Sequence, residues 1–272
     1  MDRHSRGITP TEAGDELYRR ARQILDLVTE TEVALARFGT AQPQSLTLGL
    51  PPAIARLIGI ELTMGPRVPE RIDITIEEGW SNELFDHMVA GGIDFVLGYD
   101  LPHQAGVTRL ELADERFAFA AAAGQLHEDG PISLREALAH DLVFYGRQSV
   151  GSRAVRAAAE RFDCGVNIVG EVGSLEVWRE MVLRGVGATI VPVGALGSEI
   201  AAGRIVLREI VGGPVELRMA LAARTEVYRA GVATGFVPFI QDLVNRSYLP
   251  FHGRFTNLFH LGTPGDGPAR VN

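Results

Sequence analysis

Residues 77–92 read EEGWSNELFDHMVAGG, and residues 170–185 read GEVGSLEVWREMVLRG. Each stretch has a serine where a helical pattern begins and a glycine where it ends, as capped helices do. At an offset of about 93 residues the Glu, Ser, Met, Val and final Gly positions coincide, and an aromatic residue recurs between them. The alternative to a repeat is that any strand followed by a capped helix shares some of these residues. Both interpretations predict two strand–helix–strand lobes.

Apolar strands and amphipathic helices alternate outward from both stretches. Such alternation at short spacing is typical of βαβ units with parallel strands. The predicted fold is therefore α/β with two lobes. The predicted strands and helices cover residues 46–50, 53–64, 72–76, 81–91 and 93–97, then 142–145, 152–162, 167–171, 174–184 and 188–191.

The connections between the lobes give the predicted domain boundaries. Apolar segments at 116–123 and 215–223 are candidate hinge strands, and a helix over 228–245 returns to the first lobe. Phe251, Phe255 and Phe259 follow at a spacing of four, which predicts a short docked helix. The predicted divisions are an N-terminal segment 1–42, lobe I at 43–121 plus 220–245, lobe II at 122–219 and a tail at 246–272.

A long amphipathic helix is predicted before the first lobe. Thr9, Pro10 and Glu12 form a helix start with a capping box, and Gly39 ends the pattern. Apolar residues recur at spacings of four and three, interrupted by Thr31, which is the period of a coiled-coil seam. The pattern predicts a homodimer or homotetramer, and the alternative is a helix packed on its own domain. The seam residues are Leu17, Ala21, Ile24, Val28, Leu35 and Phe38.

The composition excludes several classes of protein. All 26 basic residues are arginines, so no Walker A lysine, pyridoxal phosphate Schiff base or lysine nucleophile exists. Cys164 is the single cysteine, which excludes an intrachain disulfide and a Cys-rich zinc site. The formal net charge of −8 gives the whole chain no electrostatic reason to coat DNA. Histidines at metal-ligand spacing and a GxSxG motif are absent, so we expect no enzyme activity, metal or cofactor.

The N-terminus and the hydropathy predict a cytoplasmic protein without membrane association. The first residues contain no apolar core of a secretory signal. No apolar run approaches the roughly 20 residues of a membrane-spanning helix.

Four helix starts that follow strands predict a binding site between the lobes. Helix N-termini direct backbone N–H groups and a positive dipole toward one place, and ligands in open α/β sheets collect at the carboxyl ends of strands. We expect a small organic anion, with Arg153 adding a charge-assisted bond and Trp80 a flat apolar wall. For each serine alone, helix capping is the alternative role. The predicted site residues are Ala53, Trp80, Ser81, Gln148, Ser149, Ser152, Arg153, Ser174 and Pro192.

The stretch RHSRGITPTEAGDELYRRARQIL at 3–25 resembles the end of the wing and the linker helix of LysR-type transcriptional regulators. The resemblance continues through LTLGLPPAIARLI, EEGWSNELFDHMVAGGIDFVLGYD and RGVGATIVPVGAL, and it covers residues 3–245. It implies a two-lobed, periplasmic-binding-protein-like (type 2) effector domain with a ligand site between the lobes. It also implies an oligomer that binds promoter DNA, with Arg3 and Arg6 as contacts to phosphate.

This sequence departs from the family pattern in two places. The helix-turn-helix of the family is expected upstream of Arg3, so promoter binding requires a DNA-reading segment that these residues do not supply. In the cleft, Ala53 stands where the family often has Ser or Thr, and Trp80 stands at an often polar position, whereas Pro192 keeps the pattern. The resemblance therefore favours the sensing and dimerising portion of a transcriptional regulator. The alternatives are a solute-binding protein and a small enzyme of the same two-lobed fold.

Overall fold

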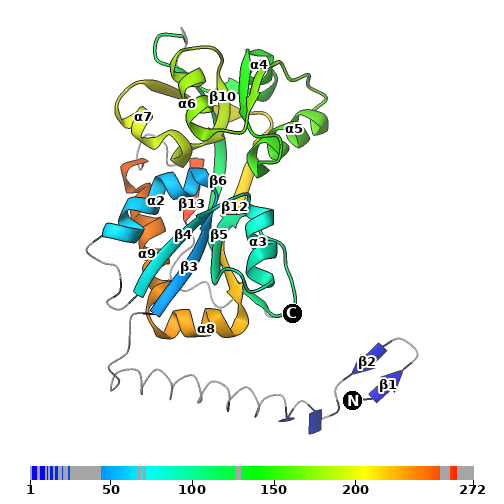
Figure 1. The fold of residues 1–272 in the computed structure, drawn as a ribbon. Coiled ribbons are helices and arrows are strands. Elements are labelled where there is room, and N and C mark those ends of the chain that lie inside the picture. Colours follow the sequence, from blue (N-terminus) through cyan, green and yellow to red (C-terminus); the bar gives the residue numbers. More distant parts are fainter. Residues whose placement is uncertain are drawn as a thin grey trace.

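The computed structural model describes residues 2–4, 7–9, 11, 13–14, 16–17, 20, 24, 44–65, 69, 72–125, 130–251 and 258–261. Among these residues, no helix is both long and apolar enough to cross a membrane. Near the N-terminus, β1 (Asp2–His4) pairs antiparallel with β2 (Gly7–Thr9). The two-lobed body follows (Figure 1).

Lobe I contains the parallel sheet that the sequence predicts. Strand β3 (Gln44–Leu50) lies between β4 (Ile72–Glu78) and β5 (Phe95–Tyr99), and both pairings are parallel. Helices α2 (Pro52–Met64) and α3 (Ser81–Val89) connect these strands. Each helix begins directly after a strand, so its N-terminus lies at the carboxyl end of that strand.

Lobe II repeats this arrangement. Strand β8 (Leu142–Tyr145) pairs parallel with β9 (Ile168–Val172), and an isolated parallel bridge joins Leu142 to Ala188 just before β10 (Thr189–Pro192). The other elements of the lobe are β7 (Ile132–Ser133), α4 (Leu134–Ala139), α5 (Val150–Arg161), α6 (Leu175–Leu183), η1 (Val193–Leu196), α7 (Gly197–Ala201) and β11 (Ile205–Val211).

One long strand joins the two lobes. Strand β6 (Val107–Ala122) has 16 residues and runs between the lobes in Figure 1. Up to Arg116 it pairs antiparallel with β12 (Glu216–Arg224) and β13 (Phe259–Leu261). From Phe117 onward its partners are β10 and β11 of lobe II. The exchange of partners therefore falls at residues 116–117, and the predicted boundaries at 121 and 219 stay predictions.

The sheet of lobe I buries both faces. On β12, the side chains of Met219 and Leu221 join the large core that contains α2 and α9, whereas Ala220 and Ala222 join a smaller cluster under α3. This alternation is the two-residue period of a strand. Because both faces are covered there, the strand is wholly apolar from Met219 to Ala223.

The structure corrects four details of the sequence prediction. The single helix expected at 228–245 is wrong, because Gly235 at φ +83° separates α8 (Thr225–Ala233) from α9 (Phe236–Tyr248). Thr11, not Thr9, caps the N-terminal helical residues, since its Oγ accepts a hydrogen bond from the Gly14 N–H at 3.2 Å. Ser81 opens α3 without capping it.

The fourth correction concerns the aromatic residues of the tail. Phe251 ends a short 3-10 turn, η2 (Leu249–Phe251), and Phe259 lies in strand β13. Phe255 lies outside the described residues. Phe259 pairs with Glu115 of β6, so a strand of the tail completes the lobe I sheet where a docked helix was predicted.

Replacing a helix glycine by alanine should have opposite effects on stability at two positions. A Cβ at Gly231 would overlap the fully buried ring of Phe95, which packs on Phe236 at 4.8 Å. A Cβ at Gly59 would lie 3.8 Å from Ile76, an ordinary contact. We expect Gly231→Ala to lower the free energy of unfolding by about 1–3 kcal/mol through overpacking. Gly59→Ala should raise it by about 0.5–1 kcal/mol, because alanine restricts the unfolded chain. Urea denaturation measures both, and equal signs would contradict this account.

Candidate functional site

A cavity lies between the two lobes at the carboxyl ends of their strands. Its volume is about 80 Å³, room for a few water molecules or one small group. Residues of α2 and the turn before α3 line it from lobe I, and residues of β8, α5, α6 and β10 line it from lobe II. The walls include Pro51, Pro52, Ala53, Trp80, Ser81, Tyr99, Phe117, Phe144, Tyr145, Ser149, Val150, Gly151, Ser152, Val155, Leu175, Trp178, Thr189, Ile190, Val191, Pro192, Ala195 and Leu217.

Aromatic rings dominate one wall of this cavity. The Tyr145 ring lies between two indoles, with its centroid 5.2 Å from that of Trp80 and 6.0 Å from that of Trp178. The Trp178 side chain is almost fully buried, and its Nε1–H donates to the carbonyl oxygen of Val143 at 3.2 Å. These tilted contacts lie in the range that aromatic pairs prefer, so the wall has a fixed geometry.

Three serines fix the backbone around the cavity. Ser149 caps α5, since its Oγ accepts a hydrogen bond from the Ser152 N–H at 3.0 Å. The Ser152 hydroxyl donates to the carbonyl oxygen of Tyr145 at 3.0 Å and so ties α5 to β8. Ser81 accepts from the Tyr99 N–H at 3.2 Å. The turns that open α3 and α5 are thereby held against the ends of their strands.

The structure brings six predicted site residues into the cavity wall: Ala53, Trp80, Ser81, Ser149, Ser152 and Pro192. Gln148 is exposed in the turn before α5, and Ser174 is an exposed cap of α6 that accepts from the Val177 N–H at 3.4 Å. The sequence pattern did not indicate that aromatic residues of lobe II line the site. Trp178 was visible only as the counterpart of Phe85 in the repeat. Ligand binding by any of these residues stays a prediction.

Arg153 lies beside the cavity rather than in its wall. It follows Ser152, and one residue turns a helix by about 100°, which directs Arg153 to a neighbouring pocket. Ser81, Tyr99, Val150 and Leu217 line both spaces, so the pockets share a wall. Within the described part of the chain, the exposed Arg153 guanidinium makes no ion pair. A ligand that extends past Ser81 would therefore enter a pocket lined by Arg153 and by Asp100, whose carboxylate accepts from the Arg218 N–H.

Two contacts across the cleft hold the lobes together. The Trp80 indole of lobe I rests on Gly146 of lobe II, where an added Cβ would lie 2.6 Å from Cη2 of the indole. Arg56 on α2 donates to Oε1 of the buried Glu199 on α7 at 2.5 Å. Arg179 of α6 also donates to this oxygen at 2.6 Å. Burial alone would raise the pKa of Glu199, but the hydrogen bond from Arg179 and the charge of Arg56 hold it at about 2.

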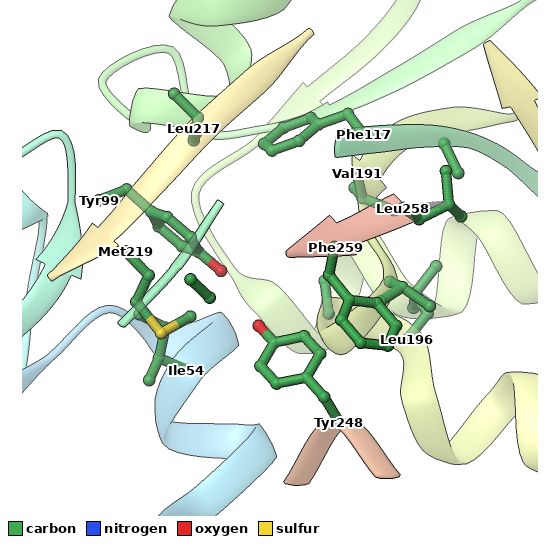
Figure 2. Close-up of a cluster of buried hydrophobic side chains, with 14 of the residues drawn as sticks. Ile54, Tyr99, Phe117, Val191, Leu196, Leu217, Met219, Tyr248, Leu258 and Phe259 are labelled. Carbon is green, nitrogen blue, oxygen red and sulfur yellow. The ribbon is translucent and has the colours of Figure 1, made fainter. Parts of the chain in front are cut away.

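A buried acid lies under the floor of the cavity. Glu115, on β6 just before the exchange of partners, is fully buried and accepts a hydrogen bond from the Tyr99 hydroxyl. Figure 2 shows the hydroxyls of Tyr99 and Tyr248 directed toward the same interior space. Burial raises the pKa of Glu115 to about 6, against the hydrogen bond from Tyr99 and the nearby Tyr248 hydroxyl, which lower it. Burial likewise raises the pKa of both tyrosines.

The N-terminal predictions are only partly described. Leu17 and Ile24 of the predicted seam are helical, with 70% and 62% of their surfaces exposed in the single chain. Arg3 lies in β1, and nothing is described of its side chain. Outside the described residues lie Arg6, Ala21, Val28, Leu35 and Phe38.

The fold and the interlobe cavity define a two-lobed ligand-binding domain. Residues 43–245 match the family model described as the LysR substrate binding domain. The match covers most of the chain, and the protein belongs to this family. A curated relative is the nitrogen assimilation regulatory protein nac of Klebsiella aerogenes, which is 28% identical over 200 residues. That alignment covers 72% of this chain and 64% of the relative, so the chain spans less than two thirds of its length.

Solved structures show the same fold. A peroxide-bound mutant of Corynebacterium glutamicum OxyR superimposes with a TM-score of 0.64 and 21% identity, covering 90% of this chain and 80% of that one. Full-length CbnR in complex with its target DNA superimposes with a TM-score of 0.57 and 20% identity, covering 87% of this chain and 81% of that one. At about 20% sequence identity, these superpositions establish only that the chains share a fold.

The buried Glu115 predicts a pH-dependent stability. Its pKa is 4.5 in a model compound and about 6 in the folded chain, so folding favours the protonated form. The protonated carboxyl therefore adds its full contribution to the free energy of unfolding below pH 4.5. As the pH rises through 6 the group ionises, and the free energy of unfolding falls by about 2 kcal/mol. Glu115→Gln cannot ionise, and its stability relative to the parent should rise by about that amount between pH 4.5 and pH 8. Urea denaturation across this range tests the prediction.

A second variant checks that the effect comes from the carboxyl group. Tyr99→Phe removes a hydrogen bond that favours the carboxylate, so it should lose more stability at pH 8 than at pH 4.5. Parallel pH profiles for the parent and Glu115→Gln would show that Glu115 does not titrate in this range.

Proposed function

We propose that this chain is the effector-sensing portion of a LysR-type transcriptional regulator that acts in the cytoplasm. The observation that carries the proposal is the cavity between the lobes, where helix N-termini from both sides meet an aromatic wall. The relatives add support, because two more of them are named as HTH-type transcriptional regulators, CfxR of Cupriavidus necator and BbuR of Bordetella bronchiseptica.

The proposed effector is a small organic anion. Its apolar body would lie against Trp80 and Tyr145, and its carboxylate would lie near Ser81 and the first turn of α5. Arg153 supplies the charge, since the pocket that it lines shares a wall with the cavity. Charge-assisted hydrogen bonds from arginine to carboxylate are stronger than neutral ones. Binding would favour one arrangement of the lobes over others and so reach the rest of the regulator.

The proposed partners are further copies of the chain and promoter DNA. We propose a homodimer or homotetramer through the helical seam, because burial of exposed apolar residues such as Leu17 and Ile24 on a second helix would stabilise association. CbnR was solved with its target DNA, which supports DNA as a partner of this family. Arg3 and Arg6 remain proposed contacts to phosphate.

The anion proposal predicts an order of effects among three substitutions. A thermal-shift screen of small carboxylates should identify a compound that raises the melting temperature of the chain. Arg153→Ala should lower the affinity for that compound about tenfold or more, because a charge-assisted hydrogen bond is lost. Ser81→Ala should lower the affinity less, because it removes only the hydrogen bond that holds the start of α3 against Tyr99.

Arg147→Ala is the matched control for the anion experiment. This arginine is 76% exposed, pairs with Glu171 and lies outside the cavity wall, so its removal should leave the affinity unchanged. Titration calorimetry measures all three variants. Equal affinities of the parent and Arg153→Ala would refute the placement of the carboxylate.

The seam proposal predicts loss of the oligomer when charge enters the apolar row. Replacing Ile24 and Val28 together by Asp would bury two carboxylates at the helix contact, which is costly without partners. Light scattering should then give the mass of a monomer for the double variant, whereas the parent chain should give the mass of a dimer or tetramer. Arg20→Asp, on an exposed residue that pairs with Glu16, is the control. An unchanged molar mass for the double variant would mean that another surface holds the oligomer.

A further inference from the structure

The distribution of tryptophan points to the kind of ligand that the cavity accepts. The chain has only two tryptophans in 272 residues, and both line this one cavity. Trp80 comes from the turn before α3 in lobe I, and Trp178 comes from α6 in lobe II. The ring planes make angles of 50° between Trp80 and Tyr145 and 47° between Tyr145 and Trp178. The aromatic wall is therefore assembled from both lobes.

The rest of the cavity offers little polar recognition. None of the described residues in its wall carries a formal charge at neutral pH. Two of its serines already bond to the backbone, since the Ser81 Oγ accepts from the Tyr99 N–H and the Ser152 hydroxyl donates to the carbonyl of Tyr145. Shape and the faces and edges of aromatic rings are therefore the features of the wall that most distinguish one uncharged group from another.

Trp80 sets the width of this space. Its indole lies against Gly146, whose φ of +59° and missing Cβ allow the two lobes to approach there. A shorter side chain at position 80 would leave that space open. The contact thus limits the thickness of anything held beside Tyr145.

We propose that the cavity selects a planar aromatic ring and that Trp80 determines this selectivity. The inference rests on the proposed function, in which the cavity binds an effector. A planar ring of six carbons is thinner than its saturated counterpart, and its edge and face complement the rings of the wall. Selection comes from the ring contacts, whereas the carboxylate outside the cavity supplies affinity.

Matched pairs of acids test this proposal on the full chain. Benzoate is compared with cyclohexanecarboxylate, and phenylacetate with cyclohexylacetate, because each pair keeps the carboxylate and the carbon skeleton. Titration calorimetry should give at least tenfold tighter binding of the aromatic member in one pair or both. Binding should also change the tryptophan emission, since both indoles of the chain lie at the cavity.

Substitutions at position 80 assign the selectivity to that residue. In Trp80→Leu the preference for the aromatic acid should fall below threefold, whereas Trp80→Phe should keep most of it. Phe162→Leu removes an aromatic ring outside the cavity and is the control, with an unchanged preference. Circular dichroism melting verifies that each variant is folded.

Each outcome bears on a different claim. Equal binding of aromatic and saturated acids overturns the proposed selectivity and leaves the proposed effector site intact. An undiminished preference in Trp80→Leu overturns the role of Trp80. If none of the four acids binds while the screen of small carboxylates finds another ligand, this inference fails and the anion-binding function stands; if the screen also finds none, both fail.

Discussion

The pairing of a single strand with two sheets is the constraint on which the rest of this structure depends. Strand β6 enters lobe I between β12 and β13 and leaves in lobe II between β10 and β11, exchanging partners at Arg116–Phe117. Each lobe thus contributes its own helix starts to one cleft, while the continuous backbone limits how the lobes can move. The buried Glu115 and the cavity-lining Phe117 flank this exchange, so the connection between the lobes and the floor of the cavity share the same stretch of β6.

Besides the continuous backbone, an ion pair and an aromatic contact join the two lobes. Arg56 reaches across from α2 to Glu199, a buried carboxylate that also binds Arg179 and Arg204. A buried carboxylate is tolerable only with such partners, because loss of water costs several kcal/mol for an unpaired ion. The second contact between the lobes is steric. The Trp80 indole packs against Gly146, which is possible because Gly146 has no Cβ. One contact depends on charge and the other on shape, so a ligand that moved the lobes would disturb both.

Local sequence patterns predicted the strand–helix–strand units of both lobes, because capping, glycine breaks and strand alternation act over a few residues. They did not predict β7, α4, α7 and β11 of lobe II. Ser174 caps α6 as expected, and Ser149 takes the capping role that was the alternative to ligand binding. Contacts that depend on distant segments were not predictable. Strand β13 exists because Phe259 pairs with Glu115, and no local pattern indicates that partner. The direction of Arg153 depends on where α5 begins, and a shift of one residue moves its side chain to another pocket. Trp178 and Phe85 hold equivalent places in the repeat, yet only Trp178 faces the cleft.

The order of the strands along the chain also has a consequence for biosynthesis. Residues 117–211 supply all the sheet partners in lobe II and are continuous in sequence. The sheet of lobe I begins at residue 44, but its central strand β12 ends at residue 224 and β13 at residue 261. Proteins are made from the N-terminus, so lobe II can complete its sheet while β5 of lobe I still lacks its partner β12. The lobe that is started first is therefore finished last, and β3–β5 present an unpaired edge until β12 emerges from the ribosome.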